Sequence, residues 1–261
     1  MCIRDRNKPV RWTATRSELF ISDHQARDHY SVSRLAIADD GKFIALEINS
    51  VANLGAYMVG SSGGVQVVQY ANLPGTVYKI PSICLNISAA FTNKTPTGVF
   101  RGPGYAETNL ILERLIDAAA LKHNFDRLEL RKKNFIDEGD MPFTDVLGGS
   151  IDSGDFSAIF DQLMTRIDLA GFEERKNESK KRGFLRGLGV ACFIKGTGGA
   201  PTENVEIRFI SGSRIDLVTG TQSIGQGHET TFPQILAKCF GVSSDCLLYT
   251  SDAADDMQCV D

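Results

Sequence analysis

The chain has 261 residues, of which 42% are hydrophobic and 23% are charged, and its formal net charge is −4 at pH 7. This length and composition allow one large or two ordinary globular domains with a sizeable core. The acidic balance argues against a nucleic-acid-binding surface, and no apolar run reaches the ~18 residues that a membrane span requires. Because the N-terminus also lacks the apolar region of an export signal, we expect a cytoplasmic protein.

The two ends of the chain differ from the rest. Residues 1–6 (MCIRDR) and 246–261 (CLLYTSDAADDMQCVD) resemble translated adapter sequence, and we predict that both are extraneous to the protein. Cysteines Cys84, Cys192 and Cys239 lie far apart between these ends and form no CxxC pair. Their spacing indicates neither a zinc site nor a disulfide framework, so we expect buried, reduced thiols.

The first part of the chain is predicted to be rich in strands. Apolar and polar residues alternate within residues 31–49 on both sides of Asp39-Asp40-Gly41, and this pattern predicts a β-hairpin. Residues 55–98 mix short apolar runs with Gly, Pro and Asn, as in strands separated by long loops.

Helices are predicted from Gly104 onward. Apolar residues recur at spacings of three and four in residues 105–125, which predicts an amphipathic helix with Glu113 and Asp117 on its polar face. Asp126, with Glu129 three residues later, predicts the N-cap of a second helix through residue 136. The apolar stripe of the first helix consists of Ile111, Leu112, Leu115, Ile116 and Ala119.

Residues 137–155 are polar and rich in Gly and Asp, and we predict that they link two domains. Residues 156–182 then show a helical pattern. Its apolar stripe consists of Phe156, Ile159, Phe160, Leu163 and Ile167. A strand is expected within residues 186–199, followed by a hairpin over residues 203–220 with its turn at Ser211-Gly212-Ser213.

A strand, a glycine loop and a helix meet at residues 219–231 (TGTQSIGQGHETT), the first candidate site. The helix is expected from Glu229, with Pro233 near its first turns and Gly241 as its stop. Its predicted inward side chains are Ile235, Leu236, Cys239 and Phe240.

Three ligands compete for the glycine loop: a phosphate, a metal ion bound by His228, or a flat heterocycle. The loop lacks both phosphate-binding patterns, GxxxxGK[ST] and GxGxxG. His228 lacks a second ligand one turn later, and Glu229 points about 100° away on a helix, so a metal site is disfavoured. Gln226, between Gly225 and Gly227, offers amide donors and an acceptor where the glycine backbone allows close approach, which favours the heterocycle.

Arg101, between Phe100 and Gly102, is the second candidate. It lies in a loop that leads into the long predicted helix. A solvated loop arginine is the simpler interpretation, because surface arginine is common. The alternative is a guanidinium placed against a substrate carbonyl or anion.

Four motifs, in this order, resemble the molybdopterin-binding large subunit of the xanthine dehydrogenase, aldehyde oxidase and carbon monoxide dehydrogenase family. They lie within residues 8–57, 99–136, 196–209 and 220–242, and the resemblance extends over residues 8–245. It implies an α+β fold with mixed sheets and flanking helices. Two incomplete cofactor-binding domains, residues 7–136 and 156–245, are expected to meet at a cleft around the cofactor.

The resemblance also implies roles for the candidate residues. Arg101, flanked by Phe100 and Gly102, would face the substrate and stabilise its developing negative charge. Gly225, Gln226 and Gly227 would bind the pterin, as molybdopterin or its cytosine dinucleotide, with molybdenum bound to it. The family hydroxylates an aldehyde or N-heterocycle carbon with water-derived oxygen. Electrons then pass to [2Fe-2S] and FAD subunits in an oligomer of heterotrimers.

Departures from the family pattern leave parts of this interpretation open. Val99 and Phe100 stand where a carbon monoxide enzyme has a cysteine-bearing loop, which disfavours that substrate. Tyr105 and Ala106 replace a commoner arginine-proline pair, so the substrate preference is undefined. The family's upstream glycine loop and late glutamate have no counterpart, so we expect an internal fragment that is inactive alone. Alternatives are a non-catalytic assembly module and a hydrolase built on His228 and Glu229.

Overall fold

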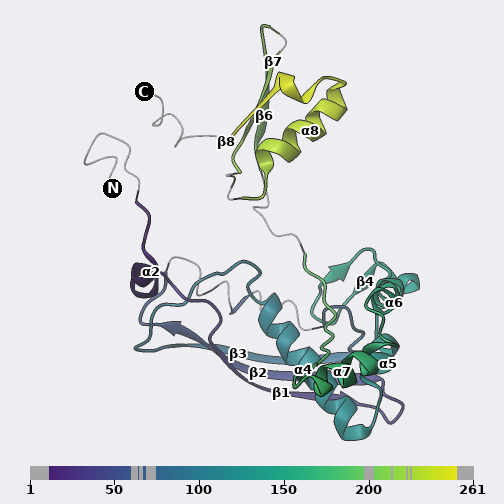
Figure 1. The fold of residues 1–261 in the computed structure, drawn as a ribbon. Coiled ribbons are helices and arrows are strands. Elements are labelled where there is room, and N and C mark those ends of the chain that lie inside the picture. The colour runs from purple at the N-terminus through teal and green to yellow at the C-terminus, as the bar shows by residue number, and fades with distance from the viewer. Residues whose placement is uncertain are drawn as a thin grey trace. The chain divides into compact units, whose positions relative to one another are not determined.

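The structure, a computed structural model, describes residues 12–59, 64, 67–68, 75–196, 203–212, 214–221, 223 and 225–251. It divides into two compact units (Figure 1). The large unit comprises Thr15–Gly196, and the small unit comprises Met1–Ala14 with Thr197–Asp261. Each unit is described by itself.

The large unit begins with a short helix and a three-stranded sheet in the order β1-β2-β3. Its elements are α2 (Arg16–Ser22), β1 (His29–Ile37), β2 (Phe43–Gly55) and β3 (Ser82–Phe91). The predicted hairpin is confirmed, because β1 pairs antiparallel with β2 and places Leu35 opposite Leu46. Strand β3 lies parallel to β2, with Leu85 opposite Ile48.

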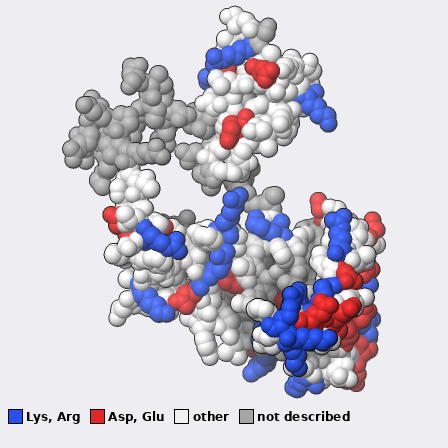
Figure 2. Space-filling model, in the orientation of Figure 1, with Lys and Arg blue, Asp and Glu red and all other residues white. Residues whose placement is uncertain are grey.

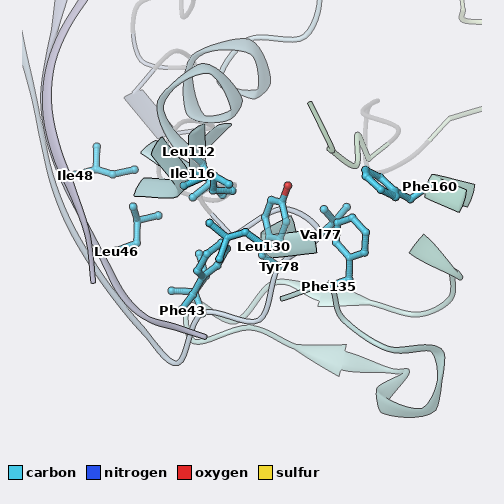
Figure 3. Packing of buried hydrophobic residues seen from close by; sticks show 12 residues of the cluster. Phe43, Leu46, Ile48, Val77, Tyr78, Leu112, Ile116, Leu130, Phe135 and Phe160 are labelled. Atoms are coloured by element: carbon cyan, nitrogen blue, oxygen red, sulfur yellow. The ribbon is translucent and has the colours of Figure 1, made fainter. Parts of the chain in front are cut away.

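Two helices follow the sheet, α4 (Tyr105–His123) and α5 (Arg127–Lys133). The predicted amphipathic helix is confirmed, since Leu112 and Ile116 of α4 are fully buried. Figure 3 shows their side chains among aromatic and aliphatic residues from the sheet, α5 and the connecting loops. Within this cluster the Tyr78 ring lies 5.6 Å from Phe43 and 5.5 Å from Phe135, between centroids.

Glu113 was expected on the polar face of α4, and this prediction was wrong. Only 6% of the residue is exposed, because its carboxylate binds Arg131 of α5 and the hydroxyl of Tyr78. The predicted N-cap of α5 is confirmed: the Asp126 carboxylate accepts hydrogen bonds from two backbone N–H groups of the first turn. Helix α5 ends at Lys133, three residues earlier than expected.

The segment predicted to be a linker contains η1 (Glu138–Asp140) and a two-strand ladder of β4 (Phe143–Thr144) and β5 (Ser150–Ile151). The domain boundary itself stays a prediction. Two helices follow, α6 (Phe156–Arg166) and α7 (Phe172–Lys181), where one helical stretch was expected. The chain breaks because Asp168 adopts a left-handed conformation (φ 48°) and Arg175 binds the carbonyls of Ile167 and Asp168. Two members of the predicted stripe, both within α6, are exposed: Ile159 (63%) and Leu163 (46%).

The strand expected within residues 186–199 is absent from its described part, residues 186–196. The alternation of apolar residues that suggested a strand is present in the structure, since Val190, Cys192 and Ile194 pack against the core. No described neighbouring strand pairs with this extended segment, so its apolar side chains anchor it instead.

The small unit contains a three-stranded sheet in the order β6-β7-β8 with one helix. Its elements are β6 (Val205–Ile210), β7 (Arg214–Thr219), α8 (His228–Phe240), η2 (Ser244–Cys246) and β8 (Leu247–Ser251). The predicted β6–β7 hairpin is confirmed, with Gly212 at φ 90° in its turn. Strand β8 pairs parallel with β7, although it falls within the residues predicted to be extraneous; that prediction remains untested.

Helix α8 begins at His228 and ends before Gly241, whose left-handed conformation (φ 67°) confirms the predicted stop. Its predicted inward face is wrong in part, because Ile235, Cys239 and Phe240 are exposed. The buried residues of α8 are instead His228 and Pro233, which shifts the inward face by about one residue. Pro233 lies in the second turn of α8, near the start of the helix as predicted.

The predicted α+β fold class is confirmed. The expectation of buried cysteines is wrong for Cys84 and Cys239, which are exposed, while Cys192 is half-buried. Cys84 is exposed because its neighbours on β3, Ile83 and Leu85, occupy the positions that face the core. Acidic and basic side chains are interspersed over the visible face of the large unit's helices (Figure 2). Among the described helices, none has the length and apolar character needed to cross a bilayer.

Candidate functional site

The Phe100–Arg101–Gly102 loop connects β3 to α4, and the residues before it are fixed on the end of β2. The N–H of Thr97 donates to the carbonyl of Leu54 (3.2 Å), and its hydroxyl donates to the carbonyl of Asn53 (2.6 Å). Gly55 turns at φ 71° with the backbone of Pro96 against it, so only a residue without Cβ fits there. The loop thus starts from a rigid position.

Arg101 is exposed and lines a pocket of about 630 Å³ within the large unit. One wall is the first half of α4, and the other is the extended segment around Val190 and Phe193. Gly102 adopts φ 83°, a conformation that favours glycine, and turns the chain into α4. The loop therefore presents Arg101 to a concave surface that contains both apolar and charged side chains.

Arg27 contacts this loop from the segment that precedes β1. Its Nη2 donates to the carbonyl oxygens of Phe100 (3.2 Å) and Arg101 (3.1 Å). Its Nε lies 3.5 Å from a carboxylate oxygen of Glu107, which is 8% exposed in the first turn of α4. Sequence reasoning gave neither residue a role, because their contacts join distant segments of the chain.

A buried charge cluster forms the base of the pocket wall. Arg131 Nε lies 2.8 Å from one Glu113 oxygen, and the Tyr78 hydroxyl donates to the other (2.6 Å). Burial, reinforced by the Glu113 charge, raises the pKa of Tyr78 and raises the pKa of the Cys192 thiol to about 11. The Tyr78 hydroxyl and the Cys192 thiol therefore stay protonated at neutral pH, and the cluster supports the pocket wall.

The end of the extended segment is tied to the start of α4. The N–H of Gly196 donates to the Tyr105 hydroxyl (3.0 Å), and the Lys195 ammonium lies 5.3 Å from the centre of the Tyr105 ring. Tyr105 also lines the pocket of about 630 Å³. Its ring also borders a second pocket of about 270 Å³.

The Gly225–Gln226–Gly227 loop precedes α8 in the small unit. Gly225 has φ 103° and Gly227 has φ 75°, and no described atom lies within 4 Å of a Cβ built at either position. Gln226 between them is half-buried. The loop therefore leaves open space beside its two glycines, which suits a flat ligand that approaches the backbone closely.

His228 begins α8, as expected for a helix-start residue. Its ring stacks on Phe232, with 4.5 Å between centroids, and its Nδ1 lies 3.4 Å from the Tyr249 hydroxyl. Glu229 points elsewhere and accepts a hydrogen bond from the Ser223 hydroxyl (3.0 Å). His228 and Glu229 thus do not form the acid–base pair of a hydrolase. Among the described residues, no group of three His, Cys, Asp or Glu side chains could bind a metal ion.

The two candidate loops lie in different units, Phe100–Gly102 in the large one and Gly225–Gly227 in the small one. Their convergence on one ligand stays a prediction, and so do the roles of their residues. Within the large unit, the structure places Arg101 beside Arg27 and the first turns of α4.

Comparison with known proteins identifies both halves of the chain. Residues 2–135 and 162–257 match two family profiles, each described as a molybdopterin cofactor-binding domain. The chain is 30% identical to the carbon monoxide dehydrogenase large chain of Hydrogenophaga pseudoflava, covering 92% of this chain and 32% of that one. It is 29% identical to the nicotine 6-hydroxylase large subunit of Paenarthrobacter nicotinovorans, covering 90% of this chain and 30% of that one.

Solved structures agree with these relationships. Quinoline 2-oxidoreductase from Pseudomonas putida 86 matches with a TM-score of 0.82 and 31% identity, over 95% of this chain and 33% of that one. The chain spans about a third of the length of these relatives. It belongs to the family of molybdopterin-binding large subunits that includes xanthine dehydrogenase, aldehyde oxidoreductase and carbon monoxide dehydrogenase.

Proposed function

We propose that this chain supplies a substrate-facing arginine and a pterin-binding loop to a molybdenum hydroxylase that oxidises an aldehyde or N-heterocycle carbon with water-derived oxygen. The observation that carries the proposal is the placement of Arg101, on a loop fixed at both sides, at the edge of a pocket of about 630 Å³. Two relatives that act on N-heterocycles, nicotine 6-hydroxylase and quinoline 2-oxidoreductase, support this substrate class.

The Gly225–Gly227 loop fits the cofactor that the family implies. Both glycines have positive φ and open space where a Cβ would project, so a planar pterin can approach the backbone. The Gln226 amide can donate to and accept from ring nitrogens and oxygens. When bound, the molybdenum–pterin group would activate water and accept the electrons of the oxidation.

Arg101 would act on the substrate. Its guanidinium is permanently charged and offers several N–H donors in one plane, so it can bind a carbonyl oxygen or ring nitrogen as negative charge develops there. Such an interaction strengthens toward the transition state and therefore raises kcat. Apolar pocket residues such as Leu110 and Phe193 would contact the substrate's ring and exclude water.

Carbon monoxide is disfavoured as the substrate, although a carbon monoxide dehydrogenase is among the relatives. No cysteine lies between Cys84 and Arg101, and Val99 and Phe100 occupy the positions just before the arginine. The proposal includes the remaining expectations: [2Fe-2S] and FAD partner subunits, a heterotrimeric assembly, and the cytosine dinucleotide form of the cofactor. This segment alone is expected to be inactive.

The test uses the complete large subunit that contains this segment, purified with its iron–sulfur and flavin subunits. Arg101→Gln should lower kcat about 10²–10³-fold, the usual loss for one donor to a developing anion, with the molybdenum content unchanged. Arg34→Gln is the matched control, because Arg34 pairs with Glu47 on the exposed face of the sheet. Equal turnover in the Arg101 variant and the control would contradict the proposed role.

A second comparison tests the cofactor loop. Gly225→Ala and Gly212→Ala impose similar backbone strain, because φ is 103° and 90° at these positions and neither Cβ meets a described atom within 4 Å. Only Gly225→Ala should reduce the molybdenum and pterin content of the purified protein. Equal molybdenum and pterin content in both variants would reject the loop as a pterin site. If the wild-type protein itself contained no molybdenum, the alternative of a non-catalytic assembly module would be favoured.

A further inference from the structure

Arg27 lies where two distant segments run side by side. The N–H of Gln25 donates to the carbonyl of Pro96 (3.0 Å), and the N–H of Gly98 donates to the carbonyl of Gln25 (2.7 Å). These bonds place residues 25–27 directly beside the start of the Phe100–Gly102 loop. A Cβ on Gly98 would clash with the His24 ring, so the two segments are in close contact.

The backbone of Arg27 is in an unfavourable conformation for its residue type. Its φ is 65°, in the left-handed region that residues other than glycine rarely adopt. The neighbouring Asp28 is fixed by Asn53, which donates from its backbone N–H and its amide (2.8 and 2.7 Å). The fold therefore maintains a conformation that glycine would adopt more easily, yet the position carries an arginine.

The Arg27 guanidinium makes three kinds of contact, each with a different part of the site. It donates to the consecutive carbonyls of Phe100 and Arg101, and it lies 5.3 Å from the centre of the Phe100 ring. It also pairs with Glu107, whose second carboxylate oxygen has no hydrogen-bond partner among the described residues. Arg27 thus links the two carbonyls on either side of the Arg101 Cα to a buried acid in α4.

We propose that Arg27 is a positioning residue, which orients the Phe100–Arg101 backbone against the start of α4 and thereby sets the direction of the Arg101 side chain. The inference rests on the proposed substrate role of Arg101. Two hydrogen bonds to consecutive carbonyls restrict the backbone rotation of Arg101, which lies between them, and the ion pair with Glu107 restrains the guanidinium itself. The Arg101 side chain is exposed, so its direction depends on its backbone.

Hydrogen exchange in the purified 261-residue chain tests the local part of this inference. Arg27→Gln should raise exchange in residues 98–103 about tenfold, whereas residues 127–136 should be unchanged. Arg16→Gln is the matched control: Arg16 lies 5.8 Å from the Phe20 ring centre on exposed α2. Arg27→Gly distinguishes the effect of the guanidinium from the effect of the backbone conformation. Glycine relieves the strain of the left-handed φ, but the variant loses all three guanidinium contacts. It should release the loop as Arg27→Gln does.

Variants of Glu107 address the risk that an unpaired buried acid destabilises the unit. The double variant Arg27→Gln with Glu107→Gln should restore the overall stability and keep the fast exchange of residues 98–103. Arg27→Lys retains the charge but has one nitrogen for both the carbonyls and the acid, so intermediate exchange is expected. Unchanged loop exchange in Arg27→Gly or in the double variant would overturn the inference.

The complete enzyme separates this inference from the proposed function. Arg27→Gln should lower kcat at least about tenfold with unchanged molybdenum content, and Arg27→Lys should recover part of the loss. If Arg101→Gln abolishes turnover while Arg27→Gln affects neither exchange nor kcat, the inference fails and the function stands. If Arg27→Gln releases the loop and Arg101→Gln leaves kcat unchanged, the proposed function fails.

Discussion

Arg131 offers a quantitative test of how the large unit is stabilised. Its side chain is fully buried, and its guanidinium contacts Glu113 at 2.8 Å, Asp117 at 2.9 Å and the carbonyl of Arg127 at 2.9 Å. Burial lowers the pKa of Arg131, but the charge and hydrogen bond of Glu113, together with Tyr78 and Asp117, raise it above its ordinary value, so the group stays charged. Replacing Arg131 with Met would leave the Glu113 carboxylate buried with the Tyr78 hydroxyl as its remaining donor.

The expected loss of stability is about 3–5 kcal/mol, the usual cost of removing one partner of a buried ion pair. This is a large part of the ~5–15 kcal/mol that stabilises a typical domain. Lys132→Met is the matched control. Lys132 Nζ lies 2.7 Å from Asp161, but their side chains are 31% and 58% exposed, so its loss should cost less than about 1 kcal/mol.

Hydrogen exchange of the α4 amides is the suitable assay, because it reports the opening of the large unit without contributions from the small one. The triple variant Arg131→Met, Glu113→Leu and Tyr78→Phe removes every polar member together. It should recover most of the loss, since an apolar replacement of a buried ion pair is often neutral or stabilising. An Arg131→Met protein within about 1 kcal/mol of wild type would refute the reasoning.

Three further predictions concern separate features. Because burial raises the Cys192 pKa to about 11, iodoacetamide at pH 8 should label exposed Cys84 well before Cys192 in peptide mapping. The stability contributed by the neutral Cys192 thiol should be complete below about pH 9 and lost between about pH 9 and 11, which should appear as a fall in the urea midpoint. Cys192→Ala should reduce this fall, and the buried Tyr78 hydroxyl, whose pKa is also raised, should account for the part that remains. Gly55→Ala should destabilise the large unit by about 2–4 kcal/mol in α4 exchange, because its Cβ would lie 2.5 Å from Pro96 Cα at a positive φ; normal stability would contradict the contact. Asp126→Ala should cost about 1 kcal/mol at α5, because two N–H bonds of 2.7 and 2.9 Å are lost, and Asp126→Asn should retain most of the stability.

Local patterns predicted much of the fold, and each success rests on neighbouring residues. The β1–β2 hairpin follows from alternation around Gly41, and α5 follows from the N-cap of Asp126. Gly241 ends α8 because a residue in the left-handed conformation closes a helix. This end could be predicted from the glycine alone. These features need no information about the rest of the chain.

The failures share a different cause, which is contact between distant residues. The periodic pattern placed Glu113 in solvent, because an acid normally faces water; its burial requires Arg131, eighteen residues later, and Tyr78. Residues 186–196 alternate as a strand does, yet a strand also needs a partner strand, which the pattern does not supply. In the candidate site, the FRG and GQG motifs identified their loops from the sequence. The contact between Arg27 and Phe100 joins residues that are 73 positions apart and requires a left-handed backbone at Arg27, and no motif encodes either feature.

Two buried acids on α4 explain why the site-forming loop can be both exposed and ordered. Glu107 in the first turn binds Arg27, and Glu113 in the third turn binds Arg131. Each acid would be costly to bury alone, so each requires its arginine partner to stay in place. Helix α4 is thereby fixed to the segment before β1 and to α5 by charge pairs, as well as by its apolar side chains. Since the Phe100–Gly102 loop leads directly into α4, the same pairs limit where that loop can lie. An exposed arginine at the end of such a loop can face a substrate in a fixed direction without being buried itself.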